Sequence, residues 1–449
     1  MNANVYAHKL AVLYRDKGAD RFMRLVVGSL VLICALVALV LVKGARIREA
    51  TFTPELATQN SDEWLLMHTN VPLGMVHTRQ VSVSPSTPVS AISSGNEVAV
   101  QFKPRLQYVT RYTVALSDGL AKLTYSFMTP KGVCYYLISP GTIKEHTVGE
   151  PTDQVVYQAP FINEFALTGN YLAVVVQNGA TDKLVIVNLK NNAVSSASLP
   201  QAGTIQYLKA SPDGQDFSFT FTSLNQKDMP YYDSTLFSLN VPANKTTPVY
   251  GFNHGLLRAT DWAYSPDGSA IVVQTFSSVI EAVYLNGVTP PLPIGAYAII
   301  DGFSYDGSEL YVGTLQKGSE VVNLSTRGAV FLNQAPMGTG SALELVAPLP
   351  NGAGYVMQVQ KAISGSANYA QYVVLVQGNK RRILYASPRG TDAIASVSVS
   401  PNDQYVAVGI SPTYFTQTNG GSPAGTLIID AHRGTVVDRI PSLEQVVWQ

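Results

Sequence analysis

The stretch AYSPDGSAIVVQ, residues 263–274, decides the fold because a tight turn is followed at once by an apolar strand. Proline presets the backbone φ of the turn, while aspartate and glycine accept the conformations that a tight turn needs. The apolar residues after the turn are typical of a buried β-strand. The stretch therefore predicts a strand–turn–strand hairpin, in which Ser265, Asp267 and Gly268 shape the chain and perform no chemistry.

Near-copies of this hairpin recur along the chain. Clear copies begin their turns at Ser211, Ser304 and Ser400, and weaker ones surround Gly169 and Gly352. Aligned on the turn, the copies start near residues 166, 211, 265, 304, 349 and 400, at intervals of 45, 54, 39, 45 and 51 residues. A period of about 46 residues with two hairpins in most copies is typical of a four-stranded propeller blade. We predict an all-β fold, a β-propeller of about seven four-stranded blades.

The S-P-D-G turn followed by an apolar strand resembles the blades of TolB-like periplasmic propellers and their WD-repeat-like relatives. The resemblance runs over roughly residues 160–440 and implies the fold. We expect residues 91–102, 114–128 and 132–138 to form one further blade. The C-terminal EQVVWQ, residues 444–449, is expected to pair into the first blade and close the ring, because an open array leaves unpaired strand edges.

The composition supports the all-β prediction and limits the partners. The chain is 46% hydrophobic and only 13% charged, with 35 glycines and 24 tyrosines, as in a protein of strands and turns. Its 30 basic and 30 acidic side chains give a formal net charge of zero. Without a basic field there is no support for a nucleic-acid partner.

A charge-free run over residues 25–42, LVVGSLVLICALVALVLV, matches the length of a membrane-spanning helix. More Lys and Arg precede the run than follow it, which predicts a cytoplasmic tail over residues 1–24. A cleavable signal peptide is the alternative, but no small-residue cleavage site follows before Lys43. We expect a single-pass protein of the bacterial inner membrane, with Gly28 and Ser29 as candidates for packing against a partner helix.

The remaining chain divides into two predicted parts. Residues 43–90 include a segment rich in Pro, Ser and Thr and are predicted to form an extracytoplasmic stalk. Residues 91–449 are predicted to form the propeller domain outside the cytoplasm.

The sequence contains no recognisable catalytic, cofactor or metal motif. Its six histidines are scattered without metal-ligand spacing, and its two cysteines, Cys34 and Cys134, form no thiolate cluster. Neither a G-x-S-x-G elbow nor a glycine-rich nucleotide loop is present. We therefore predict no catalytic, cofactor-binding or metal-binding residue, and a protein that is not an enzyme.

Two segments between strands, residues 223–234 and 411–425, are longer and more aromatic than a hairpin needs. They carry the candidate partner-binding residues Tyr231, Tyr232, Tyr414 and Phe415. Aromatic side chains on polar loops are common anchors of protein interfaces. The alternative is that these rings fold back onto their own blades.

These features predict a docking scaffold whose partners are other proteins of the cell envelope. Residues 8–24, HKLAVLYRDKGADRFMR, are similar to the Tyr-Arg-Asp segment before the membrane helix in bitopic inner-membrane subunits of type IV secretion and conjugation machines. That resemblance implies a complex of this kind. The alternative function is a ligand-binding or catalytic propeller that acts on a glycan or peptide in the periplasm. Homo- and hetero-oligomers both remain open.

Overall fold

The computed structural model describes residues 22–35, 45–117, 122–227, 229–314, 318–332, 337–338, 341–366, 368–412, 424–443 and 446–449. The chain forms two compact units. The smaller comprises Met1–Thr53, Asp62–Lys103 and Arg111–Met128, and the larger comprises Pro54–Ser61, Pro104–Thr110 and Thr129–Gln449.

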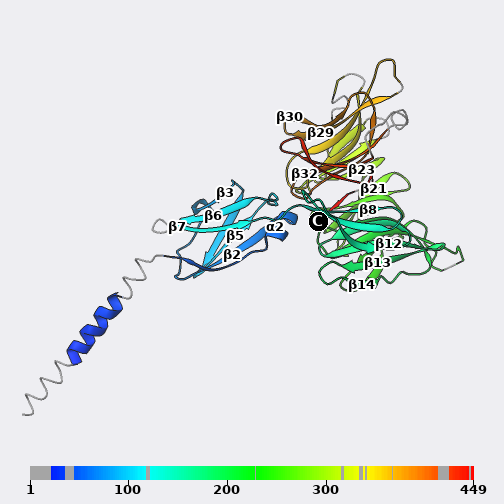
Figure 1. The fold of residues 1–449 in the computed structure, drawn as a ribbon. Helices are drawn as coiled ribbons and strands as arrows, with labels where there is room; N and C mark the ends of the chain where they lie inside the picture. Colours follow the sequence, from blue (N-terminus) through cyan, green and yellow to red (C-terminus); the bar gives the residue numbers. More distant parts are fainter. Residues whose placement is uncertain are drawn as a thin grey trace, which may run out of the picture. The chain divides into compact units, whose positions relative to one another are not determined.

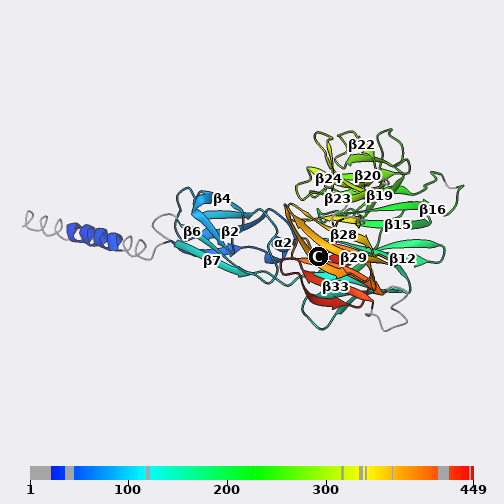
Figure 2. The same cartoon turned by 90° about the horizontal axis from the view of Figure 1, so that it is seen from above.

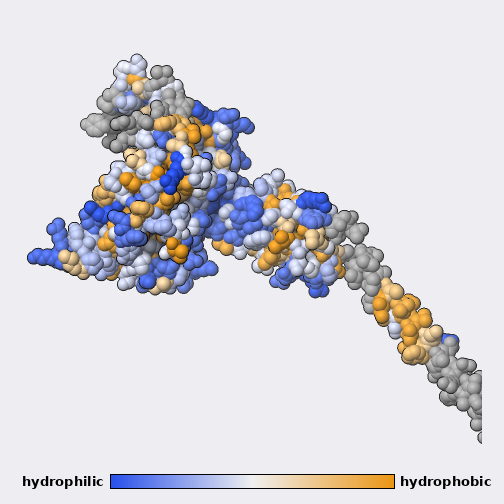
Figure 3. Space-filling model, turned by 180° about the vertical axis from the view of Figure 1, so that it is seen from behind, coloured by the Kyte–Doolittle hydropathy of each residue, from blue (hydrophilic) through white to orange (hydrophobic). Residues whose placement is uncertain are grey.

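The N-terminal region is helical over residues 22–35, and apolar side chains gather along this helix (Figure 3). Among the residues that the structure describes, no helix is both long and apolar enough to cross a membrane. Of the predicted span over residues 25–42, residues 36–42 lie outside the described residues.

The smaller unit consists of two small antiparallel sheets. One has the strand order β1 (Ile47–Thr51), β2 (Glu63–Thr69), β5 (Glu97–Phe102), β4 (Val89–Ser94), and the other β3 (Val81–Ser84), β6 (Arg111–Ser117), β7 (Lys122–Met128). Alternate residues of β2 and β5 are buried, as expected for strands with one covered face. The ring centroids of Phe102 in one sheet and Phe127 in the other lie 5.8 Å apart, so the two sheets share an aromatic core.

This unit corrects two predictions. The predicted stalk over residues 43–90 contains three whole strands and the start of β4, and the predicted propeller start at residue 91 falls inside β4. Residues 91–102 and 114–128 pair with strands of the smaller unit and contribute nothing to a blade. Their turn-and-strand pattern identifies hairpins correctly, but a hairpin pattern does not determine which sheet the hairpin joins.

The larger unit is a propeller. Within the described residues it contains seven four-stranded antiparallel sheets, here called blades 1 to 7. Blade 1 has the order β35 (Val447–Trp448), β8 (Val133–Ile138), β9 (Thr142–Thr147), β10 (Gln154–Gln158). Blade 2 is β11 (Ile162–Thr168), β12 (Tyr171–Asn178), β13 (Thr181–Asn188), β14 (Ala193–Ser196), and blade 3 is β15 (Gly203–Ala210), β16 (Asp216–Ser223), β17 (Thr235–Asn240), β18 (Lys245–Pro248).

The other blades continue in chain order (Figures 1 and 2). Blade 4 is β19 (Ala259–Tyr264), β20 (Ala270–Thr275), β21 (Val279–Tyr284), β22 (Leu292–Ala296), and blade 5 is β23 (Ile299–Phe303), β24 (Glu309–Thr314), β25 (Gly318–Asn323), β26 (Ala329–Phe331). Blade 6 is β27 (Ser341–Pro348), β28 (Tyr355–Ala362), β29 (Tyr369–Gln377), β30 (Lys380–Ser387), and blade 7 is β31 (Asp392–Val399), β32 (Tyr405–Pro412), β33 (Gly425–Asp430), β34 (Thr435–Ile440).

The last strand of the chain closes the ring. In β35, Val447 pairs with Tyr135 and Trp448 with Cys134 of β8, and Figure 1 shows this red strand beside β8. The Trp448 indole Nε1 donates a hydrogen bond of 3.2 Å to the hydroxyl of Ser398 in blade 7. This confirms the predicted closure by the C-terminal strand, which removes the strand edge that an open array would expose.

The second strand of each blade is apolar on both faces because every blade packs between two neighbours. In blade 3, Phe217, Phe219 and Phe221 of β16 are completely buried and join one cluster with Ala173 and Val175 of blade 2. This explains why the strand after each S-P-D-G turn reads as an apolar run.

The turn residues are used to shape the turn. The Ser265 hydroxyl donates to Asp267 Oδ1 over 2.6 Å and accepts from Ala270 N over 3.0 Å, while Gly268 has φ of 72°. The hydrogen bond from Ser265 lowers the pKa of Asp267. In blade 5, the Ser304 hydroxyl likewise donates to Asp306 Oδ1 and accepts from Glu309 N.

Helix α2 (Pro54–Gln59) and residues 104–110 lie against the first turns of blades 6 and 7. Arg105 N donates to Asn351 Oδ1 over 2.6 Å, and Asn402 Nδ2 donates to Leu106 O over 2.9 Å. The side chain of Arg105 reaches the carbonyl of Gln59 in α2 over 2.6 Å. Both turns that hold this segment depart from the S-P-D-G pattern.

Candidate functional site

The predicted anchor residues do not form one exposed group. In the loop between β16 and β17, Tyr231 is half-buried, whereas Tyr232 is only 8% exposed. The Tyr232 ring lies 5.0 Å from that of Phe237 in the blade core, and its backbone N donates to Ser223 Oγ. The prediction of Tyr232 as an exposed anchor is therefore wrong, because this ring folds back onto its own blade.

For four further residues, the described structure gives no support for the predicted partner contacts. Tyr414 and Phe415 lie outside the described residues. Gly28 and Ser29 lie on the exposed helix 22–35, and a Cβ at Gly28 would meet no atom within 4 Å. Their role in packing against a partner helix stays a prediction.

An exposed apolar surface lies beside the predicted loop, between blades 3 and 4. We call it the blade 3–4 surface and define it by Tyr250, Phe252, Leu256 and Phe276, which are 53%, 56%, 37% and 54% exposed. The first three residues belong to the connection between β18 and β19, in which Tyr250 and Leu256 form an isolated β-bridge. This connection projects three large apolar side chains that the blade core does not use.

Arg258 joins the parts of this surface. Its guanidinium lies 4.5 Å from the centre of the Phe276 ring and forms a salt bridge with Asp233 of the β16–β17 loop. The backbone N of Phe252 donates to Glu281 Oε2 over 3.0 Å. These contacts link the β16–β17 loop, the β18–β19 connection and blade 4.

The sequence contained an indication of this surface. The interval of 54 residues between the turns at Ser211 and Ser265 is the longest of the series. The additional residues lie in the β16–β17 loop and in the β18–β19 connection. Scanning long intervals for apolar residues, in place of scanning loops for tyrosine, would have found it.

Charged groups also connect the first strands of blades 2, 3 and 4. The Glu164 carboxylate accepts hydrogen bonds from Tyr207 N over 3.0 Å and from Leu208 N over 2.6 Å. Tyr207 has φ of 55°, a left-handed conformation that is rare for a bulky residue. Lys209 Nζ lies 2.6 Å from Asp261 Oδ1. These groups mainly bond to the neighbouring blade, so their arrangement explains how the blades are joined.

Blade 5 contributes a buried carboxyl group, Asp301. Burial raises its pKa to about 6, although the backbone N of Val346 at 3.5 Å acts in the opposite direction. Among the described residues, no three His, Cys, Asp or Glu side chains are grouped so that they could hold a metal ion. Asp301 therefore has no ligand cluster around it in that part of the chain.

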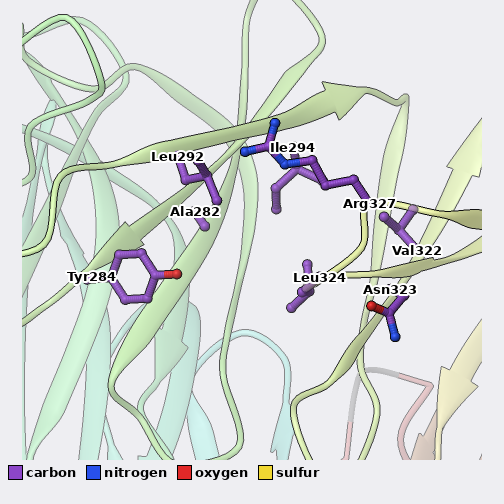
Figure 4. A pocket seen from close by; sticks show the side chains of 8 residues that line it. All are labelled: Ala282, Tyr284, Leu292, Ile294, Val322, Asn323, Leu324 and Arg327. Carbon is purple, nitrogen blue, oxygen red and sulfur yellow. The ribbon is translucent and has the colours of Figure 1, made fainter.

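A small hollow lies between blades 4 and 5 (Figure 4). Its cavity volume is about 40 Å³, which is too small for a ligand of any size. Its walls come from β21, β22 and β25 and are mainly aliphatic, while Tyr284, Asn323 and Arg327 provide polar groups.

No family model matches the chain, and no curated protein matches it in sequence. Solved structures with a similar fold include TolB from Acinetobacter baumannii, at 13% identity and a TM-score of 0.37, covering 82% of each chain. They also include the β-propeller domain of Cps50 (Swd1) from Myceliophteria thermophila, at 11% identity and a TM-score of 0.42, covering 63% of this chain and 87% of that one.

An oligogalacturonate lyase in complex with manganese is similar at 11% identity and a TM-score of 0.46, covering 68% of this chain and 83% of that one. At these identities the likenesses concern the fold alone. The propeller itself follows from the strand order and ring closure described above.

Proposed function

We propose that the propeller is a docking module for other proteins of the cell envelope and that the blade 3–4 surface is its contact site. The observation that carries this proposal is the group of exposed rings Tyr250, Phe252 and Phe276, which the blade core does not use. Large aromatic side chains surrounded by polar groups are typical of the energetic centre of protein interfaces. Removing one such side chain from water contributes about 1.5–3 kcal/mol.

The contacts of Arg258 favour a prepared surface. Its guanidinium is fixed against Phe276 by the salt bridge with Asp233, so less side-chain freedom is lost when a partner binds. Arginine beside aromatic rings is itself enriched at interface centres. Tyr231 and the predicted anchors Tyr414 and Phe415 would enlarge the same docking function.

The proposed location follows from the sequence. The apolar run over residues 25–42 and its basic N-terminal flank favour a single-pass anchor in the bacterial inner membrane, with the propeller on the periplasmic side. The similarity of residues 8–24 to subunits of secretion and conjugation machines favours such a machine as the complex. The proposal assigns no catalytic residue.

The alternative, a propeller that binds or cleaves a glycan or peptide, has less support. Carboxylates on the first strands of blades 2 and 4 are already engaged, since Glu164 accepts from two backbone N–H groups and Asp261 pairs with Lys209. A ligand would have to compete with these contacts.

Site-specific photo-crosslinking in intact cells tests the docking proposal. A photoreactive phenylalanine analogue at position 252 or 276 should give the same discrete crosslinked protein. The matched control is position 194, where Val194 is 58% exposed on β14 of blade 2. Equal crosslinking at position 194, or none at 252 and 276, would show that the blade 3–4 surface is not the contact site.

A further inference from the structure

Strand β7 (Lys122–Met128) forms an open edge of the smaller unit. It is the last strand of the three-stranded sheet with the order β3, β6, β7, and no described strand pairs with its outer side. Figure 2 shows it along one margin of this unit. The covered face of β7 packs onto the other sheet, because the ring of Phe127 lies 4.5 Å from that of Phe52 at the end of β1. Within the described chain, the outer edge of β7 thus has no partner strand.

Most other sheet edges of this protein are short or irregular, which is how proteins prevent strands of different molecules from pairing. The outer strands β14 and β18 have four residues each, and β26 has three. The outer strands of the remaining blades, β10, β22, β30 and β34, each pair with a register shift. In the smaller unit, β1 also pairs with a register shift, and β3 has four residues.

Strand β4 is a regular edge strand, but other residues cover its edge. The backbone N of Ala91 donates to Thr78 Oγ1 over 3.2 Å, and the backbone N of Val76 donates to Ser93 Oγ over 2.8 Å. Strand β7 has none of these protections. Its seven residues pair with β6 without a register shift, include no proline, and carry one charge, at Lys122.

The backbone groups at the open edge of β7 belong to alternate residues. Hydrogen bonds between antiparallel strands occur at every second pair of residues. Directly after β7, the backbone N of Thr129 donates to Thr110 O over 3.1 Å, and this bond sets the alternation. The odd-numbered residues of β7 therefore bond to β6, and the N–H and C=O groups of Thr124 and Ser126 point to the open edge.

The sequence of β7 is complementary to itself when two copies run antiparallel about Tyr125. In this register all seven residues pair, and Thr124 lies opposite Ser126 of the second copy. Both side chains are exposed, and pairs of hydroxyl side chains favour strand pairing. Lys122 lies opposite Met128, so like charges do not meet across the two strands.

We propose that β7 is a dimerisation strand, which pairs with β7 of a second copy of this chain about a two-fold axis through Tyr125. The three-stranded sheets of the two copies then form one sheet of six strands. A two-fold contact uses the same edge of both copies, so assembly through β7 ends at the dimer. The site belongs to the smaller unit and does not use the blade 3–4 surface, so either assignment can fail without the other.

Register-specific disulfide formation in the full chain tests this pairing. All variants carry Cys34→Ser, and Cys134 is buried. Two differently tagged chains, one with Thr124→Cys and the other with Ser126→Cys, are produced together and oxidised mildly. Paired residues of this type lie about 5.5 Å apart at Cα, a distance that suits a disulfide, whereas like positions lie diagonally at about 7–8 Å. We expect the disulfide dimer from the mixed pair and its loss when either variant is produced alone.

A proline at the open edge tests the backbone contact without removing a hydrogen bond to β6. Thr124→Pro deletes an outward N–H, and an edge strand tolerates proline where its N–H faces solvent. The matched control is Thr124→Ala, which keeps the N–H. Light scattering of the full chain in detergent measures the dimer, and a cooperative thermal melt shows that each variant is folded. We expect Thr124→Pro to weaken the dimer about tenfold or more, because each copy loses a hydrogen bond, and Thr124→Ala to remain dimeric.

Four results would overturn the assignment. A monomeric full chain without the mixed disulfide would remove the dimer, and equal disulfide yields from Thr124→Cys or Ser126→Cys alone would remove the register. A dimer that persists in a folded Thr124→Pro variant would place the contact outside β7. A disulfide from Ser126→Cys to a different protein would make β7 a docking strand for that protein in place of a second copy.

Discussion

His146 Nε2 lies 3.0 Å from Asp438 Oδ2, and this contact joins blade 1 to blade 7 beside the ring closure. The other imidazole nitrogen, His146 Nδ1, lies 2.7 Å from Asp153 Oδ1. The imidazole is 3% exposed. Both ring nitrogens of His146 therefore face carboxylate oxygens.

Replacement of Asp438 by alanine should destabilise the propeller by about 1–3 kcal/mol, because a buried N–H of His146 and the backbone N of Gly149 lose their acceptor. Asp438→Asn keeps an acceptor oxygen and should be destabilised less. Chemical denaturation at neutral pH measures both variants. Equal stability of Asp438→Ala and the unchanged protein would contradict a role of this contact in closure.

Low pH should weaken the junction between blades 1 and 7, because it protonates the Asp153 carboxylate that contacts His146. Burial acts to raise the pKa of Asp153, but hydrogen bonds from Tyr136 and His146 bring it below the ordinary value of 3.8. A carboxyl group with a lowered pKa in the folded state stabilises the protein above its unfolded pKa, and this contribution is lost as the pH falls through the folded pKa. The Asp153→Asn variant should therefore be less stable than the unchanged protein at neutral pH, and this difference in stability should become smaller as the pH falls. A stability profile below pH 4 that is parallel to that of the unchanged protein would contradict this.

Asp403 should show the opposite pH dependence. It occupies the position of the turn glycine in blade 7, with φ of 61°. Burial raises its pKa to about 7, although Asn351 N and Arg105 act to lower it. A raised carboxyl pKa means that stability falls as the pH rises from the unfolded value to the folded one, here between 3.8 and about 7.

Asp403→Asn should thus gain on the order of 1–3 kcal/mol at and above neutral pH and gain little in acid. Asparagine also tolerates the left-handed backbone. The control is Asp267→Asn, since the pKa of Asp267 is lowered and this variant should gain nothing at neutral pH. Denaturation profiles that keep the original pH dependence in Asp403→Asn would disprove the assignment.

The short C-terminal strand should contribute more to the stability of the propeller than its length suggests. Deleting residues 446–449 removes the pairing with β8, the buried Val446 and the Trp448 ring, which stacks 6.1 Å from Tyr405. We expect a loss of at least about 3 kcal/mol, comparable to removing one large core side chain. Trp448→Ala alone should lose less. A truncated chain that melts at the same temperature as the full chain would show that the propeller does not need this strand.

Two residues from adjacent segments should respond differently to the same substitution. Tyr232→Ser removes a buried core ring and should destabilise the fold by about 3–5 kcal/mol. Phe252→Ser removes an exposed ring and should change stability by no more than about 0.5 kcal/mol, while weakening the partner by about 1–3 kcal/mol if it is an anchor. Thermal melts and partner binding, measured on both variants, separate these effects. A Phe252→Ser variant with a large stability loss would place that ring in the core.

Local chemistry in the chain was sufficient to predict the propeller. Pro266, Asp267 and Gly268 determine a turn whatever surrounds them, since their backbone preferences act within a few residues. The repeated interval then implied blades, and unpaired edges implied closure by residues 444–449. These inferences depend on short-range conformational preference and on the need of every strand edge for a partner.

The tertiary structure alone decided which sheet a hairpin joins and which face a loop residue presents. Residues 91–102 have the same local pattern as a blade hairpin, yet they pair within the smaller unit because pairing depends on contacts far apart in the chain. Tyr231 and Tyr232 are adjacent, but only Tyr232 enters the core, since the space beside Phe237 is created by residues from another strand. The salt bridge between Arg258 and Asp233 likewise connects segments that no sequence pattern links. Packing between distant residues, not local preference, therefore selected the surface that the blades expose.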